Sequence, residues 1–325
     1  MKQTFNIHEF IEGILSSDIS YVSKAITLIE STRPEHQEQA QQIINAIIQY
    51  SGKSFRLGIT GVPGVGKSTF IESFGLEVIN RGHQLAVLAI DPSSQLSKGS
   101  ILGDKTRMEQ LSVHPKAFIR PSPSSGSLGG VTRKTKESII ICEAAGYDYI
   151  IVETVGVGQS ETAVHQLTDF FLLLMLAGAG DELQGIKRGI MEMADGMAIT
   201  KADGANADKA KLARAEYARA LHLFPPTESK WIPEVLVCSG TENKGISGVY
   251  EMLEKYRRHT VSNGFFEQKR NRQSTQWLHQ IIHDTLIERF YSDPNIKEKI
   301  LAIEKKLQQN AVNPYQAAMD LFKKI

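Results

Sequence analysis

Cysteine is scarce in this sequence, and its scarcity argues against two classes of protein. The 325 residues contain 2 cysteines, Cys142 and Cys238, and both lie within apolar stretches. A disulfide-stapled secreted domain or a cysteine-ligated metal centre would need more thiols at characteristic spacings. We therefore expect two reduced thiols in the protein core.

Charge of one sign is also lacking. Lys and Arg together number 37 and Asp and Glu number 36, which gives a formal net charge of +1. A balanced chain has no field that would attract nucleic acid or an anionic membrane. We expect neither of these partners.

No hydrophobic run is long enough to cross a membrane. The most apolar run, from Phe170 to Gly180, is shorter than the roughly 20 residues that a spanning helix needs, and it predicts a buried strand. The stretch from Met1 to Ser17 contains polar residues throughout, unlike a secretory signal. We expect a cytoplasmic protein.

What the sequence does contain, over its middle part, is short β-rich runs that alternate with helix-length segments. Several runs are apolar along their whole length, which is typical of strands covered on both faces. The pattern predicts an α/β fold with a mainly parallel central sheet flanked by helices. The predicted strands fall at 55–60, 83–91, 117–122, 148–154, 169–177, 194–200 and 231–239.

Helical patterns lie on either side of the β-rich part. Residues from about 7 to 51 predict helices, with a stripe of Ile43, Ile44, Ile47 and Ile48 that ends near Gly52. After about residue 245 the β signal ends, and three further helices are predicted. Their apolar faces need cover, either by packing back onto the α/β unit or by a subunit contact. The first of them places five residues on one side: Leu278, Ile281, Ile282, Thr285 and Leu286.

One glycine-rich stretch, GVPGVGKST, matches the phosphate-binding pattern G-x-x-x-x-G-K-[ST]. It follows an apolar strand and precedes a helix, which is the context that the pattern requires. Glycines let backbone N–H groups turn toward phosphate oxygens, and the helix N-terminus adds partial positive charge. Lys67 is predicted to reach the β- and γ-phosphates, and Ser68 to ligate Mg²⁺. The predicted nucleotide-binding residues are Gly61, Val62, Pro63, Gly64, Val65, Gly66, Lys67, Ser68 and Thr69.

Acidic residues at two strand ends are candidates for the metal. Asp91 and Glu153 each end a predicted strand, where side chains face the ligand crevice of an open α/β sheet. Asp104 is a further candidate. Gly156 follows Glu153 by three residues, so its amide is placed to sense a γ-phosphate. The stretch ETVGVGQSE is therefore predicted to act as a switch.

The stretch TKADG indicates which base is bound. It resembles the guanine-reading pattern N-K-x-D, with Thr200 in place of Asn. The carboxylate of Asp203 accepts from guanine N1–H and the exocyclic amine, a pair of donors that adenine lacks, while the Lys201 stem covers the ring. The exchange of Asn for Thr is expected to alter a hydrogen bond that braces the loop. One strand later, Ser239 and Gly240 offer backbone amides to guanine O6.

With these residues, the chain resembles the MeaB/ArgK family of P-loop GTPases over about residues 35–325. The resemblance rests on GVPGVGKST, AIDPSS, GSILGDKTRM, RPSPSSGSLGG, IIVETVGVGQSE, GAGDELQGIKRGIMEMAD, TKADG and NPYQAAMDLF. It implies a Mg²⁺-dependent GTPase that binds GTP and GDP. It further implies a homodimer that acts as a metallochaperone for an adenosylcobalamin-dependent acyl-CoA mutase, of the methylmalonyl-CoA or isobutyryl-CoA type, gating cofactor loading and protecting the mutase.

The resemblance also assigns parts of the chain. Residues 1–52 are expected to form an N-terminal helical extension, 53–260 the P-loop GTPase domain, and 261–325 a C-terminal dimerisation arm. Gln184 and Lys187 lie in a segment that matches an additional switch, from which they would reach the nucleotide. The expected catalytic residues are Lys67, Glu153 and Lys187.

Two other functions compete with this interpretation. One is an ATPase or kinase of a lysine/arginine/ornithine transport system, which would need an adenine site and an acceptor pocket. Asp203 argues against the adenine site. The other is a nickel-insertion GTPase, which would carry Cys or His clusters, whereas the histidines here are scattered.

Overall fold

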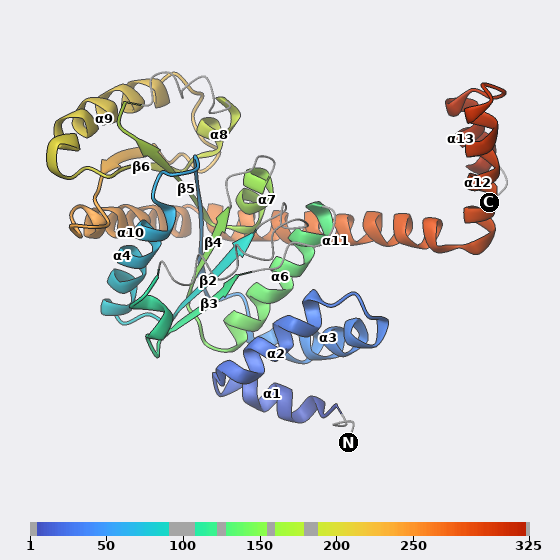
Figure 1. Ribbon diagram of the computed structural model, residues 1–325. Coiled ribbons are helices and arrows are strands. Elements are labelled where there is room, and N and C mark those ends of the chain that lie inside the picture. The colour runs from blue at the N-terminus through green and yellow to red at the C-terminus, as the bar shows by residue number, and fades with distance from the viewer. Residues whose placement is uncertain (1–4, 91–107, 122–127, 155–159, 179–187, 323–325) are drawn as a thin grey trace. The chain divides into compact units, whose positions relative to one another are not determined.

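The computed structural model describes residues 5–90, 108–121, 128–154, 160–178 and 188–322 (Figure 1). By its internal contacts the chain divides into two units, Met1–Gln273 and Ser274–Ile325. Each unit is described by itself. Among the described helices, none is both long and apolar enough to cross a membrane.

The first unit is built on a seven-stranded sheet in the order β3-β2-β4-β1-β5-β6-β7. Every neighbouring pair is parallel, as the run of fully apolar strands predicts. Each of the seven predicted strands is confirmed. Their bounds are β1 Phe55–Gly61, β2 Leu85–Ile90, β3 Ala117–Pro121, β4 Tyr149–Thr154, β5 Phe170–Leu176, β6 Gly196–Thr200 and β7 Glu234–Val237.

Helices cover both faces of this sheet (Figure 1). Helices α4 (Lys67–Asn80) and α10 (Ile246–Ser262) pack together on one face, and α6 (Leu128–Ala144) and α7 (Ser160–Leu167) on the other. Helix α9 (Ala207–Leu221) covers β6 and β7. Alternate residues of β1 enter the α4–α10 core, where they are fully buried. Shorter helical segments are η2 Leu111–Val113, α8 Arg188–Met193 and η4 Gly204–Asn206.

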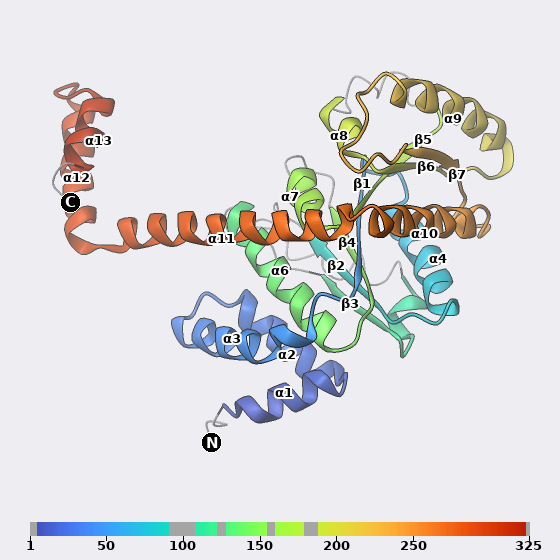
Figure 2. The same ribbon diagram turned by 180° about the vertical axis from the view of Figure 1, so that it is seen from behind.

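Three N-terminal helices, α1 (Ile7–Leu15), α2 (Ile19–Glu30) and α3 (Pro34–Ile47), pack beside α6 (Figure 2). Asn6 and Asp18 begin the first two by accepting backbone N–H groups at their N-termini. The apolar stripe of α3 is buried as predicted through Ile47. Ile48 is the exception: it begins the short segment η1 (Ile48–Tyr50), where the chain turns it outward and leaves it 46% exposed.

Both cysteines are free and buried, as predicted. Burial raises the pKa of Cys238 to about 12, and it also raises the pKa of Cys142. Each thiol therefore stays protonated and inert at neutral pH.

The second unit is entirely helical over its described residues. It holds the end of α11 (Phe265–Ser292), then α12 (Pro294–Gln308) and α13 (Pro314–Phe322), in agreement with the three predicted helices. Asp293 caps α12 by accepting from Asn295 N at 2.7 Å. Helices α12 and α13 pack on one another, and the rings of Phe290 and Phe322 stack at 5.1 Å.

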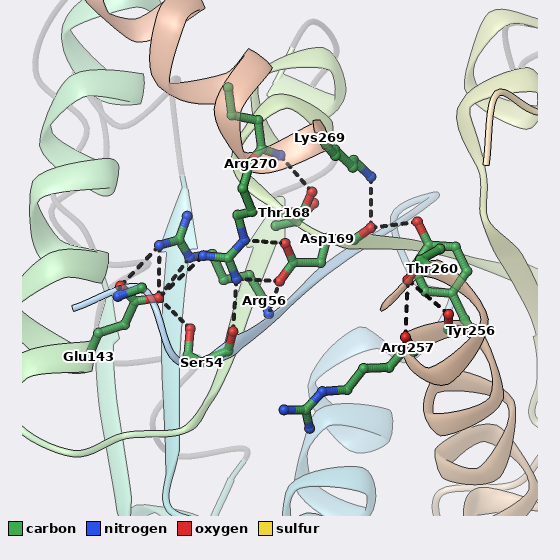
Figure 3. Close-up of polar contacts among 12 residues, drawn as sticks. Ser54, Arg56, Glu143, Thr168, Asp169, Tyr256, Arg257, Thr260, Lys269 and Arg270 are labelled. Atoms are coloured by element: carbon green, nitrogen blue, oxygen red, sulfur yellow. Dashed lines mark hydrogen bonds and ion pairs between the residues drawn. The ribbon is translucent and has the colours of Figure 1, made fainter. Parts of the chain in front are cut away.

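A buried ionic cluster joins the beginning of α11 to the amino ends of β1 and β5 (Figure 3). At its centre, the Asp169 carboxylate accepts from Arg270 Nε at 2.5 Å and from Arg270 Nη2 at 2.6 Å. It also accepts from the Arg56 backbone N–H at 2.8 Å. The guanidinium of Arg56 pairs in turn with Glu143 of α6. Although burial lowers the pKa of Arg270, the carboxylates of Asp169 and Glu143 raise it above its usual value.

Candidate functional site

The glycine-rich stretch forms the turn between β1 and α4, as predicted. Gly64 and Gly66 adopt the left-handed conformation, with φ of +80° and +92°. A Cβ atom at Gly61 would lie only 2.7 Å from the carbonyl oxygen of Leu174, so the loop begins where β1 and β5 run too close for a side chain. The backbone therefore favours glycine at these three positions, and the sequence pattern requires it at Gly61 and Gly66.

The N-terminus of α4 opens at this loop. Its N-cap is Gly66, which has no side chain to accept from the first amides of the helix. These N–H groups carry the partial positive charge of the helix and are suited to an anion. Lys67 is the first helical residue, and its Nζ donates to the carbonyl oxygen of Gly61 at 2.7 Å. The glycine-rich loop and the N-terminus of α4 therefore have the hydrogen-bond donors that a phosphate requires.

The base-reading segment follows β6. Lys201 has a positive φ of +54°, which turns the chain so that Asp203 projects beside the loop after β7. The carboxylate of Asp203 accepts from Ser239 Oγ at 2.6 Å and from Thr241 Oγ1 at 2.8 Å. These two hydrogen bonds, that of Ser239 first, lower the pKa of Asp203. Asp203 is therefore held in one orientation as a carboxylate, the form that accepts from guanine.

One cavity of about 190 Å³ connects the phosphate loop with the base-reading segments. Six of the residues that the sequence predicts to bind nucleotide line this cavity. Three residues that were not assigned to nucleotide binding also line it: Phe70, Thr200 and Thr241. The six predicted residues are Val65, Gly66, Thr69, Lys201, Asp203 and Gly240.

Glu153 is the acidic candidate for the metal that the structure describes. It lies at the carboxyl end of β4, opposite Ile59 of β1, and is 6% exposed. The hydroxyls of Thr154 and Thr60 hydrogen-bond at 2.8 Å, which holds the ends of β4 and β1 together. The carboxylate therefore belongs to the strand next to the one that leads into the phosphate loop. Ser68 lies in the first turn of α4.

Val62 and Pro63 lie in the turn after β1 and do not line the cavity. Five predicted site residues lie outside the described part of the chain: Asp91, Asp104, Gly156, Gln184 and Lys187. Within the described part, no group of three or more His, Cys, Asp or Glu side chains gathers as metal ligands. Mg²⁺ often takes only one or two protein groups, together with phosphate oxygens and water. Ser68 and Glu153 fit that pattern.

Thr200, which stands where the guanine-reading pattern has Asn, is the last residue of β6. Its hydroxyl donates to the carbonyl oxygen of Val65 in the phosphate loop at 2.6 Å. The sequence did not identify Thr241 as a residue that orients Asp203. Its position two residues after Ser239, with a second hydroxyl group, could have indicated this role. Ser73 was also missed; its Oγ donates to the Gly240 carbonyl oxygen at 2.7 Å.

A glycine-rich turn between the first strand and a helix, on a parallel sheet, defines a P-loop NTPase. A family model described as "Methylmalonyl Co-A mutase-associated GTPase MeaB" matches residues 22–295. This match covers most of the chain, which therefore belongs to the MeaB family of P-loop GTPases and is itself a GTPase.

Several relatives agree with this assignment. GTPase ArgK of Escherichia coli is 43% identical over 300 residues, covering 91% of this chain and 91% of that protein. A protein of Mus musculus named "Methylmalonic aciduria type A homolog, mitochondrial" is 44% identical over 321 residues, covering 96% of this chain and 77% of its own length. A crystal structure described as a LAO/AO transport system kinase has a TM-score of 0.77 and 34% identity, covering 99% of each chain.

Proposed function

We propose that this GTPase is a Mg²⁺-dependent G-protein metallochaperone for an adenosylcobalamin-dependent acyl-CoA mutase of the methylmalonyl-CoA mutase type. In this role it would gate cofactor loading and protect the mutase from inactivation. The description of the family, which names an association with that mutase, is the observation that carries the proposal. The mammalian relative named for methylmalonic aciduria supports it.

The described residues suit the nucleotide part of this role. Lys67 and the first amides of α4 would bind phosphate oxygens, and the carboxylate of Asp203 would accept from guanine at the other end of the cavity. Ser68 and Glu153 would hold Mg²⁺, which neutralises phosphate charge when bound. Gly156, Gln184 and Lys187 would contribute from the two switches.

The sequence predicts slow hydrolysis by the chain alone. Val157, not glutamine, follows Gly156, so no water-orienting glutamine stands directly after the switch glycine. We expect the cognate mutase to raise the rate of GTP hydrolysis at least about tenfold, because a group that completes charge neutralisation in trans can add about 10³ or more. Phosphate release with and without the mutase measures this, with mutase alone as the control. Equal rates would contradict the proposed role.

A second candidate, a kinase of a LAO/AO transport system, is raised by the name of the structural neighbour. It would need an adenine site. The Asp203 carboxylate, fixed by Ser239 and Thr241, offers acceptors where adenine has no matching pair of donors. We therefore favour the mutase-associated role.

We propose in addition that residues 261–325 form a dimerisation arm. In support, the second unit exposes large apolar side chains, among them Leu278 at 55%, Leu286 at 63% and Leu301 at 59%. Leu286→Glu should convert a dimer into a monomer, because it places a charge among apolar groups that would otherwise be covered. Light scattering on the whole protein measures the mass. Leu223→Glu is the matched control, since Leu223 of the first unit is 83% exposed. An unchanged mass for Leu286→Glu would exclude this face as the interface.

A further inference from the structure

Strands β1 and β4 lie side by side in the sheet, and their pairing ends just before the candidate site. The last partners in their register are Ile59 of β1 and Glu153 of β4. Beyond them, Thr60 pairs with β5 and Thr154 pairs with β2. The two strands therefore part after Ile59 and Glu153, at the carboxyl edge where an open α/β sheet binds its ligands.

One side-chain contact joins the two strands beyond this point. The hydroxyls of Thr60 and Thr154 hydrogen-bond at 2.8 Å, and the two residues are 2% and 0% exposed. They lie on the face of the sheet that α7 covers, because a Cβ at Gly58 would lie 2.8 Å from Val164 of that helix. Apolar groups in their place would approach to about 3.5–4.0 Å. The hydroxyl pair therefore holds the strand ends closer together than apolar packing would.

The carboxylate of Glu153 lies on the other face of β4. Successive side chains of a strand alternate between its two faces. Tyr149 and Ile151 of β4 are buried in the core that contains residues of α4 and α10, so Glu153 continues their row on the side of α4. Ser68 lies in the first turn of that helix. The two candidate metal groups therefore share one face of the sheet, and the hydroxyl pair lies on the opposite face.

We infer that Thr60 and Thr154 are positioning residues for Mg²⁺ binding. Their hydroxyl pair fixes the end of β4 against the strand that leads into the phosphate loop, and so fixes Glu153 relative to Ser68. Neither hydroxyl is expected to touch the metal or the nucleotide. Mg²⁺ demands near-ideal octahedral geometry, so its affinity depends closely on where a carboxylate stands. The inference rests on the proposed Mg²⁺ site and adds to it the contact that sets its geometry.

The dependence of nucleotide affinity on Mg²⁺ tests the inference. The probe is the β,γ-imido analogue of GTP, whose dissociation constant is measured by calorimetry in EDTA and in excess Mg²⁺. We call the ratio of these two constants the magnesium factor. The wild type should bind the analogue more tightly in Mg²⁺, because the metal bridges the β- and γ-phosphate oxygens. Thr154→Val should lower the magnesium factor about fivefold and leave the affinity in EDTA within about twofold, as expected for the loss of one buried hydrogen bond.

A role in stability alone is separated from positioning by the double variant. Thr60→Val or Thr154→Val leaves one buried hydroxyl without its partner, so each should lower the midpoint of thermal unfolding. The double valine variant removes both hydroxyls and should recover most of that midpoint, while its magnesium factor stays as low as in the single variants. Thr60→Ser and Thr154→Ser keep the hydroxyls and should keep the wild-type factor. If a single valine variant does not fold, the double valine and double serine variants are compared instead.

A change at Glu153 shows whether the hydroxyl pair acts through that carboxylate. Glu153→Gln should lower the magnesium factor at least about tenfold, because it removes an anionic oxygen from the metal site. Adding Thr154→Val to it should then lower the factor no further. Thr260→Val is the matched control, because the Thr260 hydroxyl is fully buried and donates to the Tyr256 carbonyl oxygen at 2.9 Å, within α10. Its loss should leave the magnesium factor unchanged.

Two results would overturn the inference, and they are distinguishable. If the wild type binds the analogue equally well in EDTA and in Mg²⁺, the proposed Mg²⁺ site is itself wrong, and that part of the proposed function fails with the inference. If the wild type prefers Mg²⁺ but Thr60→Val and Thr154→Val keep the wild-type magnesium factor, only the positioning role is wrong.

Discussion

Lys67→Ala is expected to weaken the binding of GTP and GDP at least about a hundredfold and to bring hydrolysis to background. An ammonium group makes charge-assisted hydrogen bonds worth about 1.5–3 kcal/mol each to phosphate oxygens, and two such bonds account for that factor. In the structure Lys67 is the first residue of α4, and its Nζ lies 2.7 Å from the Gly61 carbonyl oxygen, inside the loop. The Lys67 side chain therefore already lies at the phosphate-binding loop.

Lys211→Ala is the matched control for this variant. Lys211 is a helical lysine whose Nζ pairs with Asp208 at 2.9 Å, and its side chain is 72% exposed. The Lys211→Ala protein should bind GDP with the affinity of the wild type. Calorimetry gives both affinities, and thermal unfolding without nucleotide checks that the Lys67 variant folds. A folded Lys67→Ala protein that binds GDP normally would show that the phosphates bind elsewhere.

The sheet and the phosphate loop could be predicted because their signals are local. Strands β1 and β4 are buried along their whole length and β5 over all but its last residue, so their apolar runs mark them in the sequence as strands with helices on both faces. Gly61 and Gly66 mark a close approach and a left-handed turn in the same way. Periodicity does not predict where an element ends. By its spacing Ile48 continues the helical stripe of α3, but α3 ends at Ile47 and Ile48 begins the 3-10 segment η1.

The contacts that complete the candidate site could not be predicted, because they join residues far apart in the chain. The Thr200 hydroxyl reaches Val65 across 135 positions, and Ser73 reaches Gly240 across 167. The sequence predicts that threonine in place of asparagine alters a bracing hydrogen bond, but it does not indicate that the hydroxyl donates to the Val65 carbonyl oxygen. Chemistry of single residues suggested Asp203 as the base reader, but only the fold shows that Thr241 helps to orient it.

The ionic cluster around Asp169 also joins residues that lie far apart in the chain. Its disruption is expected to have the largest effect on stability. Asp169→Ala should lower the free energy of unfolding by about 3–5 kcal/mol, because the buried guanidinium loses the carboxylate to which it donates and keeps only Glu143, at 3.7 Å. Asp169 is 1% exposed, and the Arg270 side chain is 14% exposed. Thermal unfolding of the whole protein should show a fall of about 6–20 °C in the midpoint.

A neighbouring arginine of the same helix provides the control. Arg272 Nη1 lies 2.6 Å from Glu228 Oε2, but these side chains are 47% and 67% exposed. Glu228→Ala should therefore cost no more than about 1 kcal/mol, since water screens and solvates both groups. The contrast between the two variants compares a buried Arg–carboxylate pair with an exposed one, formed by arginines two residues apart.

The reason for the cost can be tested as well. If an unpaired buried charge is the cause, removing the charge should recover part of the loss, so Asp169→Ala with Arg270→Met should be more stable than Asp169→Ala alone. Recovery should be incomplete, because the Arg56 backbone N–H still lacks the acceptor that Asp169 supplied at 2.8 Å. A double variant less stable than Asp169→Ala would mean that Arg270 stabilises this region mainly through its bond to the Ser54 carbonyl oxygen at 2.8 Å and its packing over Phe266.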